Sequence, residues 1–303
     1  MNAHQSAGRR ARSQHGVLAH GQALRAGLTQ EEIEGKTGRG EWLHPVRGVY
    51  IMAGAPVTWR QEAMVALLAG GPKAVVSHLT AAAVLDFWQH PPRVPHIIVP
   101  PGSSPRSPVA TVHRSALGPS DRLMVGGIAT TSATRTLIDA AAVLNRRELE
   151  DLVDDVFCRQ LSCTVAVGSA VERLGRRGRR GLLLLEEVID VWTPGIQPGS
   201  PAEMRLLRRL ADWGYSPPER QVDVVSADGR FIGRADLGWV SERVGFEYDS
   251  DRRHNPRYWV RDEARDAGYE AAGWRILPVG KRDLMPSSDL RERIDRAFRQ
   301  QAA

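Results

Sequence analysis

The sequence is poor in cysteine, in lysine and in long apolar runs. Its 303 residues include two cysteines, Cys158 and Cys163, and their spacing matches neither a zinc knuckle nor a redox pair. We therefore expect two reduced, largely buried thiols and no disulfide framework. No apolar run reaches about 18 residues, which argues against a membrane-spanning helix, and the N-terminal stretch lacks the apolar segment of a secretion signal. These absences predict a cytoplasmic protein with no membrane partner.

Positive charge exceeds negative charge, and arginine carries almost all of it. The formal net charge is +6, and only Lys36, Lys73 and Lys281 are lysines among 41 basic residues. A basic chain favours an anionic partner such as nucleic acid, and arginine can hold phosphate through two parallel hydrogen bonds. Genomic base composition is an alternative source of the arginine preference. The chain is 42% hydrophobic and 25% charged, which is typical of a folded globular protein.

The N-terminal stretch predicts a disordered basic tail followed by a small helical unit with a hairpin. We assign residues 1–15 to the tail and residues 16–55 to a helix, a turn, a second helix and a β-hairpin. Thr29 begins the second helix, and Glu32 completes a capping box with it. A small helical cap with a surface hairpin is the alternative interpretation.

Two short helices followed by a two-stranded wing resemble the reduced winged helix-turn-helix of AbiE-type antitoxins. The resemblance implies that residues 16–55 bind DNA, with the second helix in the major groove. Gln30 and Arg39 are then the exposed side chains expected to contact DNA. The toxin partner that such a protein would have is unknown.

Residues 56–174 predict an α+β region that resembles the segment following the winged helix in the same family. Helical periodicity alternates there with short apolar strands. We assign this region no chemistry. His78 and His113 are interpreted as polar side chains with ordinary partners rather than as ligands.

Residues 175–200 combine a basic cluster with a breaker run, and we expect a basic linker or helix there. The Pro/Gly/Ser run at residues 193–201 predicts a domain boundary. The arginines either lie along a phosphate backbone or are solvated side chains of a linker. The candidates for nucleic-acid contact in this cluster are Arg176, Arg177, Arg179 and Arg180.

Three carboxylates gather in two strands expected on either side of Ser241 and Glu242. A symmetric hairpin pairs Asp236 with Glu247, with β-carbons about 4.5–5.5 Å apart on one face, and Asp249 joins that face. Opposed like charges destabilise a sheet. A divalent cation is the simplest compensation, because Mg²⁺ prefers carboxylate and carbonyl oxygens. Arginine partners or full solvation are the alternatives.

Two further residues belong to this pattern. Arg234 shares the expected face of Asp236. Glu203 falls at the third position of an amphipathic helix that Ser200 caps and Pro201 begins. Its ordinary role there is to complete a capping box.

Residues 201–303 resemble the PD-(D/E)XK nuclease fold. A helix-borne glutamate, a strand aspartate and Glu-x-Asp about ten residues later occur in the order of that fold. The branch similar to very-short-patch-repair endonucleases adds a histidine soon after Glu-x-Asp, here His254. It also adds an Asp…Arg-Asp helix that ends in Ala-Gly-Trp and a strand, here WVRDEARDAGYEAAGWRILPV.

The resemblance implies a role for each matching residue. Arg265 would hold a phosphate beside Asp262, and Asp266 would support the site. His254 would act as a general acid or base, or contact a phosphate. Asp249 would be a further acidic ligand or would orient water. The implied metal ligands are Asp236, Glu247, Glu203 and the Tyr248 carbonyl.

The fold expected is an α+β N-terminal half with a small winged helix-turn-helix, joined to an α/β restriction-endonuclease-like domain with a mixed sheet flanked by helices. The implied function is a DNA endonuclease that uses Mg²⁺ or Mn²⁺ to activate water. The alternative is a non-catalytic DNA-binding regulator of the antitoxin class with an inactive nuclease-like domain. RNA or branched DNA as substrate stays open, and double-strand cutting by one site would favour a homodimer.

Overall fold

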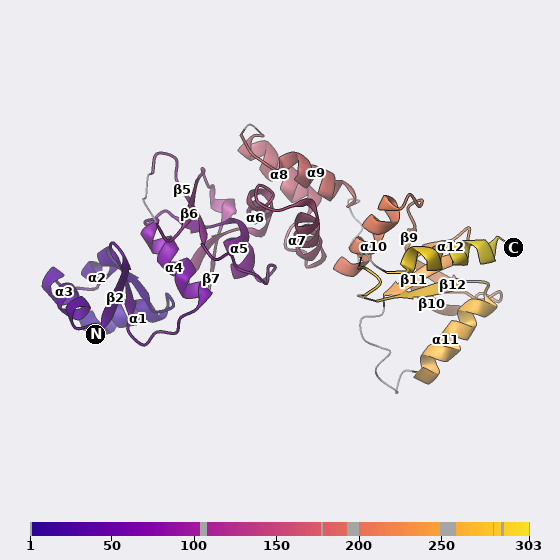
Figure 1. The fold of residues 1–303 in the computed structure, drawn as a ribbon, viewed down its shortest axis with the longest axis horizontal. Helices are drawn as coiled ribbons and strands as arrows, with labels where there is room; N and C mark the ends of the chain where they lie inside the picture. Colours follow the sequence, from indigo (N-terminus) through magenta and orange to yellow (C-terminus); the bar gives the residue numbers. More distant parts are fainter. Residues whose placement is uncertain are drawn as a thin grey trace. The chain divides into compact units, whose positions relative to one another are not determined.

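The protein divides into two compact units, residues 1–194 and 195–303, which Figure 1 shows as a ribbon. The computed structural model describes residues 2–103, 108–176, 178–192, 200–248, 259–280, 282–285 and 288–302, and the side chains of 259–264 are not described. The architecture is mixed α and β, with two mixed sheets and one antiparallel sheet flanked by helices.

The N-terminal unit begins with three helices around a three-stranded antiparallel sheet of order β1-β3-β2. The expected helix–turn–helix–hairpin order is confirmed, and Thr29 and Glu32 form the expected capping box. Strand β1, which pairs with β3, was not expected. The elements are α1 (Ala3–Arg12), β1 (Val17–Ala19), α2 (His20–Arg25), α3 (Gln30–Gly38), β2 (Trp42–Val46) and β3 (Val49–Met52).

The predicted disordered tail is wrong for residues 3–12, which form helix α1. Asn2 caps this helix, and its side chain accepts a hydrogen bond from the backbone N–H of Gln5. Ala7 and Ala11 are fully buried against Leu18 and Ile33. Ala7 and Ala11 are four residues apart, so they form one narrow buried stripe on a helix whose other faces are polar and basic. The mostly polar composition of this segment therefore concealed the helix.

A mixed five-stranded sheet of order β6-β5-β4-β8-β7 forms the centre of the N-terminal unit. Strands β5 and β6 run parallel, as do β4 and β8, and the other two pairs are antiparallel. The expected helices α4 and α5 and strands β5, β6 and β8 are present. The elements are α4 (Trp59–Ala69), β4 (Val75–Val76), α5 (His78–Val84), β5 (His96–Val99), β6 (Thr111–Arg114), β7 (Arg122–Val125) and β8 (Ile128–Thr131), with a 3₁₀ turn at Pro119–Asp121.

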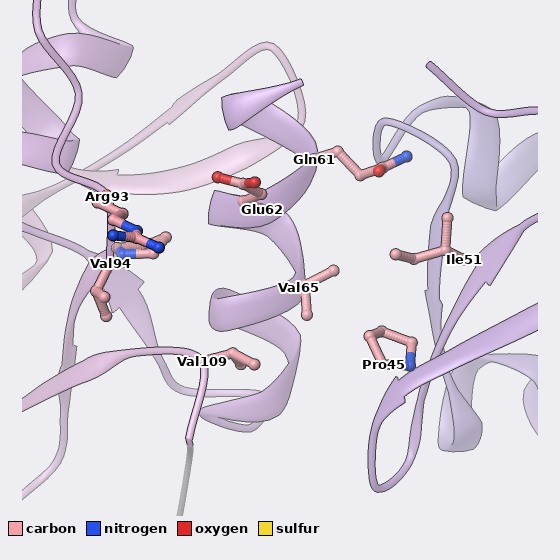
Figure 2. A pocket seen from close by; sticks show the side chains of 9 residues that line it. Pro45, Ile51, Gln61, Glu62, Val65, Arg93, Val94 and Val109 are labelled. Atoms are coloured by element: carbon pink, nitrogen blue, oxygen red, sulfur yellow. The ribbon is translucent and has the colours of Figure 1, made fainter. Parts of the chain in front are cut away.

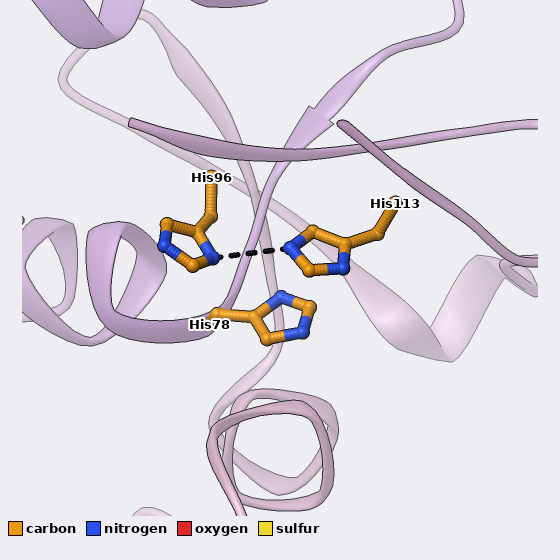
Figure 3. A group of neighbouring side chains, drawn as sticks. All are labelled: His78, His96 and His113. Carbon is orange, nitrogen blue, oxygen red and sulfur yellow. Dashed lines mark hydrogen bonds between the residues drawn. The ribbon is translucent and has the colours of Figure 1, made fainter. Parts of the chain in front are cut away.

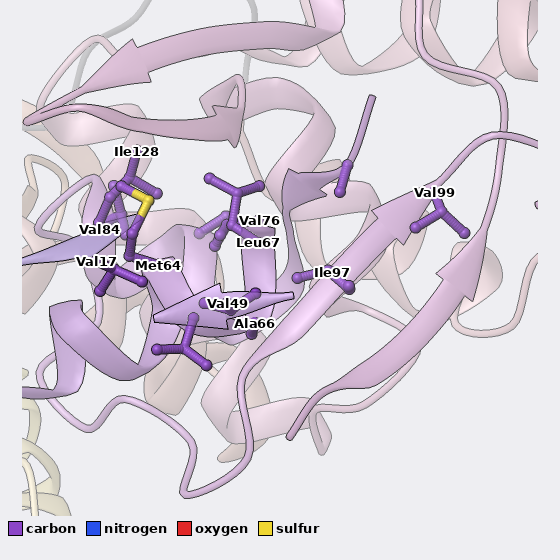
Figure 4. Packing of buried hydrophobic residues seen from close by; sticks show 13 residues of the cluster. Val17, Val49, Met64, Ala66, Leu67, Val76, Val84, Ile97, Val99 and Ile128 are labelled. Carbon is purple, nitrogen blue, oxygen red and sulfur yellow. The ribbon is translucent and has the colours of Figure 1, made fainter. Parts of the chain in front are cut away.

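One apolar core joins this sheet to strands β1 and β3 of the N-terminal segment. Figure 4 shows Val17 and Val49 packed with Met64 of α4 and Ile128 of β8. Burial of a side chain of this size contributes about 1.5–3 kcal/mol. Residues 16–55 therefore share a core with the segment that follows them.

Four helices complete the N-terminal unit. The apolar run after the arginine cluster forms α9, whose Leu182, Leu185 and Val188 are buried, and α9 packs on α7. The expectation of buried thiols is wrong for Cys163, which is exposed, and Cys158 is partly exposed. The elements are α6 (Ala133–Ala140), α7 (Arg146–Cys158), α8 (Thr164–Leu174) and α9 (Leu182–Asp190).

The C-terminal unit is a mixed four-stranded sheet of order β12-β11-β10-β9 with helices on both faces. Strands β9 to β11 are antiparallel neighbours, and α11 connects β11 to the parallel strand β12. Ser200 caps α10 through its hydroxyl, as expected. The elements are α10 (Pro201–Asp212), β9 (Glu219–Val225), β10 (Phe231–Trp239), β11 (Val244–Tyr248), α11 (Trp259–Ala271), β12 (Arg275–Val279) and α12 (Leu290–Gln301).

The register of β10 on β11 is the one expected from a four-residue loop. Leu237 pairs with Phe246, and Trp239 pairs with Val244. These four side chains lie on the buried face with Leu210 of α10 and Ile294 of α12. These apolar side chains therefore form the core side of the hairpin. Among the described helices, none is long and apolar enough to cross a membrane.

We predict that Phe246→Ala lowers the free energy of unfolding of the C-terminal unit by about 3–5 kcal/mol, because it leaves a cavity in a closed core. Segment-resolved hydrogen exchange of the full chain measures the change in each unit separately. Phe231→Ala is the matched control, since that ring is 57% exposed. Equal effects of the two substitutions would contradict the assigned core.

Candidate functional site

Asp236 and Glu247 lie on neighbouring strands where the pairing of β10 with β11 ends. The ladder pairing reaches Leu237 and Phe246, and Asp236 and Glu247 are the next residues outward. Asp236 does not continue the ladder with its backbone. Its Oδ2 accepts a hydrogen bond from the Tyr248 N–H at 2.8 Å, so the side chain replaces a main-chain acceptor.

The alternation of side chains is interrupted at Asp236. Gly233, Ala235 and Gly238 face the side of the sheet covered by Tyr269 and Trp274, whereas Leu237 and Trp239 face α10 and α12. The opposite residue on β9, Gln221, has φ of 51°, and its Nε2 lies 3.3 Å from Asp236 Oδ1. A local irregularity of this kind re-aims a side chain at a sheet position.

Helix α11 covers the acidic face and supplies partners to Glu247. The Tyr269 hydroxyl donates a hydrogen bond to Glu247 Oε1 at 2.5 Å. Arg265 Nη2 lies 2.8 Å from Glu247 Oε2. Arg265 and Tyr269 are four residues apart, so one helix face presents both. Arg265 thus compensates the negative charge of Glu247. An arginine partner is one of the alternatives to a divalent cation that the sequence leaves open.

Burial raises the pKa of the Glu247 carboxyl. The hydrogen bond from Tyr269 and the charge of Arg265 oppose this effect, while Asp236 and Asp266 raise the pKa further. Burial also raises the pKa of Tyr269. The Tyr269 hydroxyl therefore keeps its proton and donates it in the hydrogen bond to Glu247. The main cause of the raised Glu247 pKa is thus burial, and the nearby acidic residues add to it.

Glu203 is buried on α10, with 6% of its surface exposed. The Ser200 hydroxyl lies 3.3 Å from its Oε1 and also accepts a hydrogen bond from its backbone N–H at 3.3 Å. Within the described residues, Glu203, Asp236 and Glu247 do not form a group whose carboxylate oxygens all lie within 4.8 Å. Of the capping box expected here, the bond that the Ser200 hydroxyl accepts from the Glu203 N–H is present.

Two other expectations about this site differ in outcome. Arg234 does not share the face of Glu247, because its neighbours Gly233 and Ala235 face α11. It forms an exposed ion pair with Asp223. Tyr248 is partly buried, and its amide binds Asp236. Asp249, His254 and the side chain of Asp262 lie outside the described residues.

The residues predicted to contact nucleic acid in the N-terminal unit have acidic or backbone partners. Gln30 donates to Glu34 at 2.6 Å, and Arg39 pairs with Glu41 at 2.7 Å. Arg176 pairs with Glu186 at 2.6 Å, and Arg179 donates to the Gly175 carbonyl at 3.1 Å. Arg180 lines a cavity, and Arg177 lies outside the described residues.

Three histidines form a cluster in the N-terminal unit. Figure 3 shows His78, His96 and His113 with their rings side by side. One nitrogen of each lies within 4.8 Å of the others, and His96 Nδ1 is 3.1 Å from His113 Nε2. Burial lowers the pKa of His78 to about 2 and of His96 to about 4, and it also lowers the pKa of His113.

His78 and His113 do have ordinary hydrogen-bond partners, as expected, and the structure also brings them together with His96. His78 begins α5, His96 begins β5, and His113 lies on β6, which runs parallel to β5. His96 and His113 lie two residues apart in the register of β5 and β6. Their proximity can be predicted only if that pairing is known. The signal available in the sequence was a histidine in each of three consecutive predicted elements.

Two cavities lie in the N-terminal unit. The first, about 280 Å³ in volume, has apolar walls from Ile51, Val65 and Val109, with Glu62 and Arg93 also lining it (Figure 2). The second, about 490 Å³ in volume, is lined by His78, His113 and several arginines. Only the second brings a cavity to a cluster of ligand-type side chains among the described residues.

We predict that Gly233→Ala disturbs the partners of Glu247. A β-carbon at this position would overlap the Tyr269 hydroxyl, so the ring must move away from the carboxylate. The free energy of unfolding of the C-terminal unit should fall by about 1–3 kcal/mol, as for other overpacked cores, in urea denaturation. Gly168→Ala is the control, because open space surrounds that helical glycine. An unchanged stability in Gly233→Ala would contradict the contact.

We also predict that His78 and His96 stay neutral in metal-free protein at pH 5. Their pKa values are lowered to about 2 and about 4, so neither ring takes up a proton between pH 8 and pH 5. The unfolded chain does take up these protons below about pH 6.5, so this pair of rings lowers stability as the pH falls. Nuclear magnetic resonance titration of the imidazole carbons measures this directly, and a midpoint above pH 6 for either ring would refute the burial argument.

No family model matches this chain, and no curated protein does. A solved structure described as the crystal structure of RV2827C protein from Mycobacterium tuberculosis is similar over 67% of this chain and 79% of that chain. The two share 13% sequence identity, with a TM-score of 0.43. A likeness at this level carries no conclusion about the fold or the activity of this chain.

Proposed function

We propose that this protein is a metal-dependent DNA endonuclease whose C-terminal unit hydrolyses phosphodiester bonds and whose N-terminal unit binds DNA. The observation that supports the proposal is the neighbouring position of Asp236 and Glu247, each one residue beyond the last pair of the β10–β11 ladder. Two repelling carboxylates beside a buried face are expensive unless a cation joins them.

The donor set suits a hard divalent cation. Asp236, Glu247 and the Tyr248 carbonyl offer oxygen ligands, which Mg²⁺ and Mn²⁺ prefer. Such a cation would polarise a phosphate and lower the pKa of a water molecule that it binds. Glu203 does not form a compact group with the other two carboxylates, so it would reach such a cation only through water.

Arg265 is the residue suited to hold the substrate phosphate. Its guanidinium lies against Glu247 at 2.8 Å. Arg265 would hold a phosphate oxygen in place of this carboxylate, and Glu247 would then be available as a cation ligand. A guanidinium exchanges a carboxylate for a phosphate without loss of geometry, because both accept two parallel hydrogen bonds. Asp249 and His254 would act at the same centre by resemblance to the nuclease branch.

The proposal for the N-terminal unit rests on the order α2, α3, β2, β3, which matches that of a reduced winged helix-turn-helix. Helix α3 would enter the major groove with Gln30 at its first turn. Arg39 would exchange Glu41 for a DNA phosphate. Since such contacts release counterions, binding should weaken steeply as salt increases.

A second function is favoured by one contact. Glu247 already has a cationic partner in Arg265 and a hydrogen-bond donor in Tyr269. A carboxylate satisfied in this way needs no metal. On that ground the C-terminal unit would be an inactive nuclease-like domain, and the chain a DNA-binding regulator of the antitoxin class.

We predict that the purified full chain cuts plasmid DNA with Mg²⁺ or Mn²⁺ and that Asp236→Asn or Glu247→Gln lowers the rate at least about 100-fold, as expected when charge stabilisation in a transition state is lost. Gel electrophoresis of supercoiled plasmid measures the rate. Glu270→Gln is the matched control, since Glu270 is exposed on α11 and contacts Arg275.

The two functions give different results in the same preparation. Cleavage that survives both substitutions would refute the site. DNA binding in a mobility-shift assay without cleavage in either metal would favour the regulator, and loss of binding in Arg39→Ala would locate that activity in the N-terminal unit.

A further inference from the structure

We propose that His78, His96 and His113 form a binding site for one borderline divalent metal ion of the Zn²⁺ class, with an open coordination position toward an arginine-lined cavity that accepts an oxyanion. This inference is independent of the function proposed above, because none of these residues belongs to the C-terminal unit.

The geometry of the nitrogens suits a tetrahedral ion. Zn²⁺ binds imidazole nitrogen at about 2.0–2.1 Å, so two nitrogens on one tetrahedral ion lie about 3.3 Å apart. His96 Nδ1 and His113 Nε2 are 3.1 Å apart. One nitrogen of His78 completes a group within 4.8 Å.

The rings are held in place by their surroundings. His78 has φ of 51° at the start of α5, a conformation that a histidine backbone adopts at a cost. Ser77 Oγ lies 2.9 Å from His78 Nδ1, a hydrogen bond of the kind that orients metal-binding histidines. The His78 and His113 rings stack with centroids 3.8 Å apart. The cluster is thus largely arranged before any ion arrives.

The direction of the nitrogens also suits a metal. A ring nitrogen binds a cation only through its free lone pair. His96 Nδ1 and His113 Nε2 face each other across 3.1 Å. Without an ion, the close contact of His96 with His113 requires a proton between the two nitrogens.

The cavity beside the cluster explains what an open position would receive. His78 and His113 line a space of about 490 Å³, together with four arginines and one aspartate. Arg135 is neutralised by Asp139 at 3.0 Å, which leaves the excess positive charge to Arg114, Arg179 and Arg180. A site with three histidine ligands and an open fourth position is typical of catalytic rather than structural zinc. The chemistry of the cavity selects an anion with several oxygens, such as phosphate.

The test uses the full chain after removal of metal with a chelator. Equilibrium dialysis with Zn²⁺, followed by elemental analysis, should find one tightly bound ion per chain. His113→Gln and His96→Gln should each weaken binding by more than the roughly 10–100-fold loss typical of an outer-shell change, and Ser77→Ala should fall within that range. His90→Gln is the matched control, since His90 is exposed and outside the cluster.

Spectroscopy of the unsubstituted protein keeps the test independent of how the variants fold. Co²⁺ in the site should give the visible absorption of a four-coordinate ion, and inorganic phosphate should shift that spectrum, whereas excess Mg²⁺ should not displace the ion. Absence of tight binding, or binding unchanged in both His113→Gln and His96→Gln, would overturn the metal site. A Co²⁺ spectrum insensitive to phosphate would overturn the open position.

Discussion

The buried guanidinium of Arg135 holds together three parts of the N-terminal unit. With 1% of its surface exposed, it pairs with Asp139 on the same helix and donates to Ser115 Oγ and the Ala116 carbonyl at the end of β6. Asp121, 3.7 Å away, connects it to Arg173 of α8. Removing one member of such a network leaves a buried charge without compensation, which costs about 3–5 kcal/mol. The wall behind the histidine cavity depends on this arginine.

Local features of the chain were predictable, and contacts between distant segments were not. Thr29 and Ser200 cap their helices because each hydroxyl accepts a hydrogen bond from a backbone N–H in the first turn of the same helix. Such a contact is local in the sequence. The pairing of Leu237 with Phe246 followed from alternation about a short loop. The histidine cluster instead needs the parallel pairing of β5 with β6, which no local pattern encodes. Arg265 was expected to hold a phosphate, and its contact with Glu247 depends on how α11 lies over the sheet.

The two candidate centres differ in the hardness of their ligands. Oxygen atoms of Asp236 and Glu247 favour Mg²⁺ or Mn²⁺, whereas three imidazoles favour Zn²⁺ and its neighbours. The carboxylates carry charge that a cation neutralises, while the histidines are neutral and give any bound ion its full charge. If both proposals hold, the two centres would favour different ions.

The hydrogen bond from the Tyr248 amide to Asp236 makes a side chain part of the sheet. The Asp236 carboxylate can accept the Tyr248 N–H or bind a ligand. Both interactions use the same two oxygen atoms, so they compete. Occupancy of Asp236 and the spacing of β10 from β11 are thus thermodynamically linked. A ligand that binds the Asp236 carboxylate would favour separation of β10 from β11 at this end of the sheet. Any contact that holds the two strands together would then weaken binding of the ligand by the same free energy.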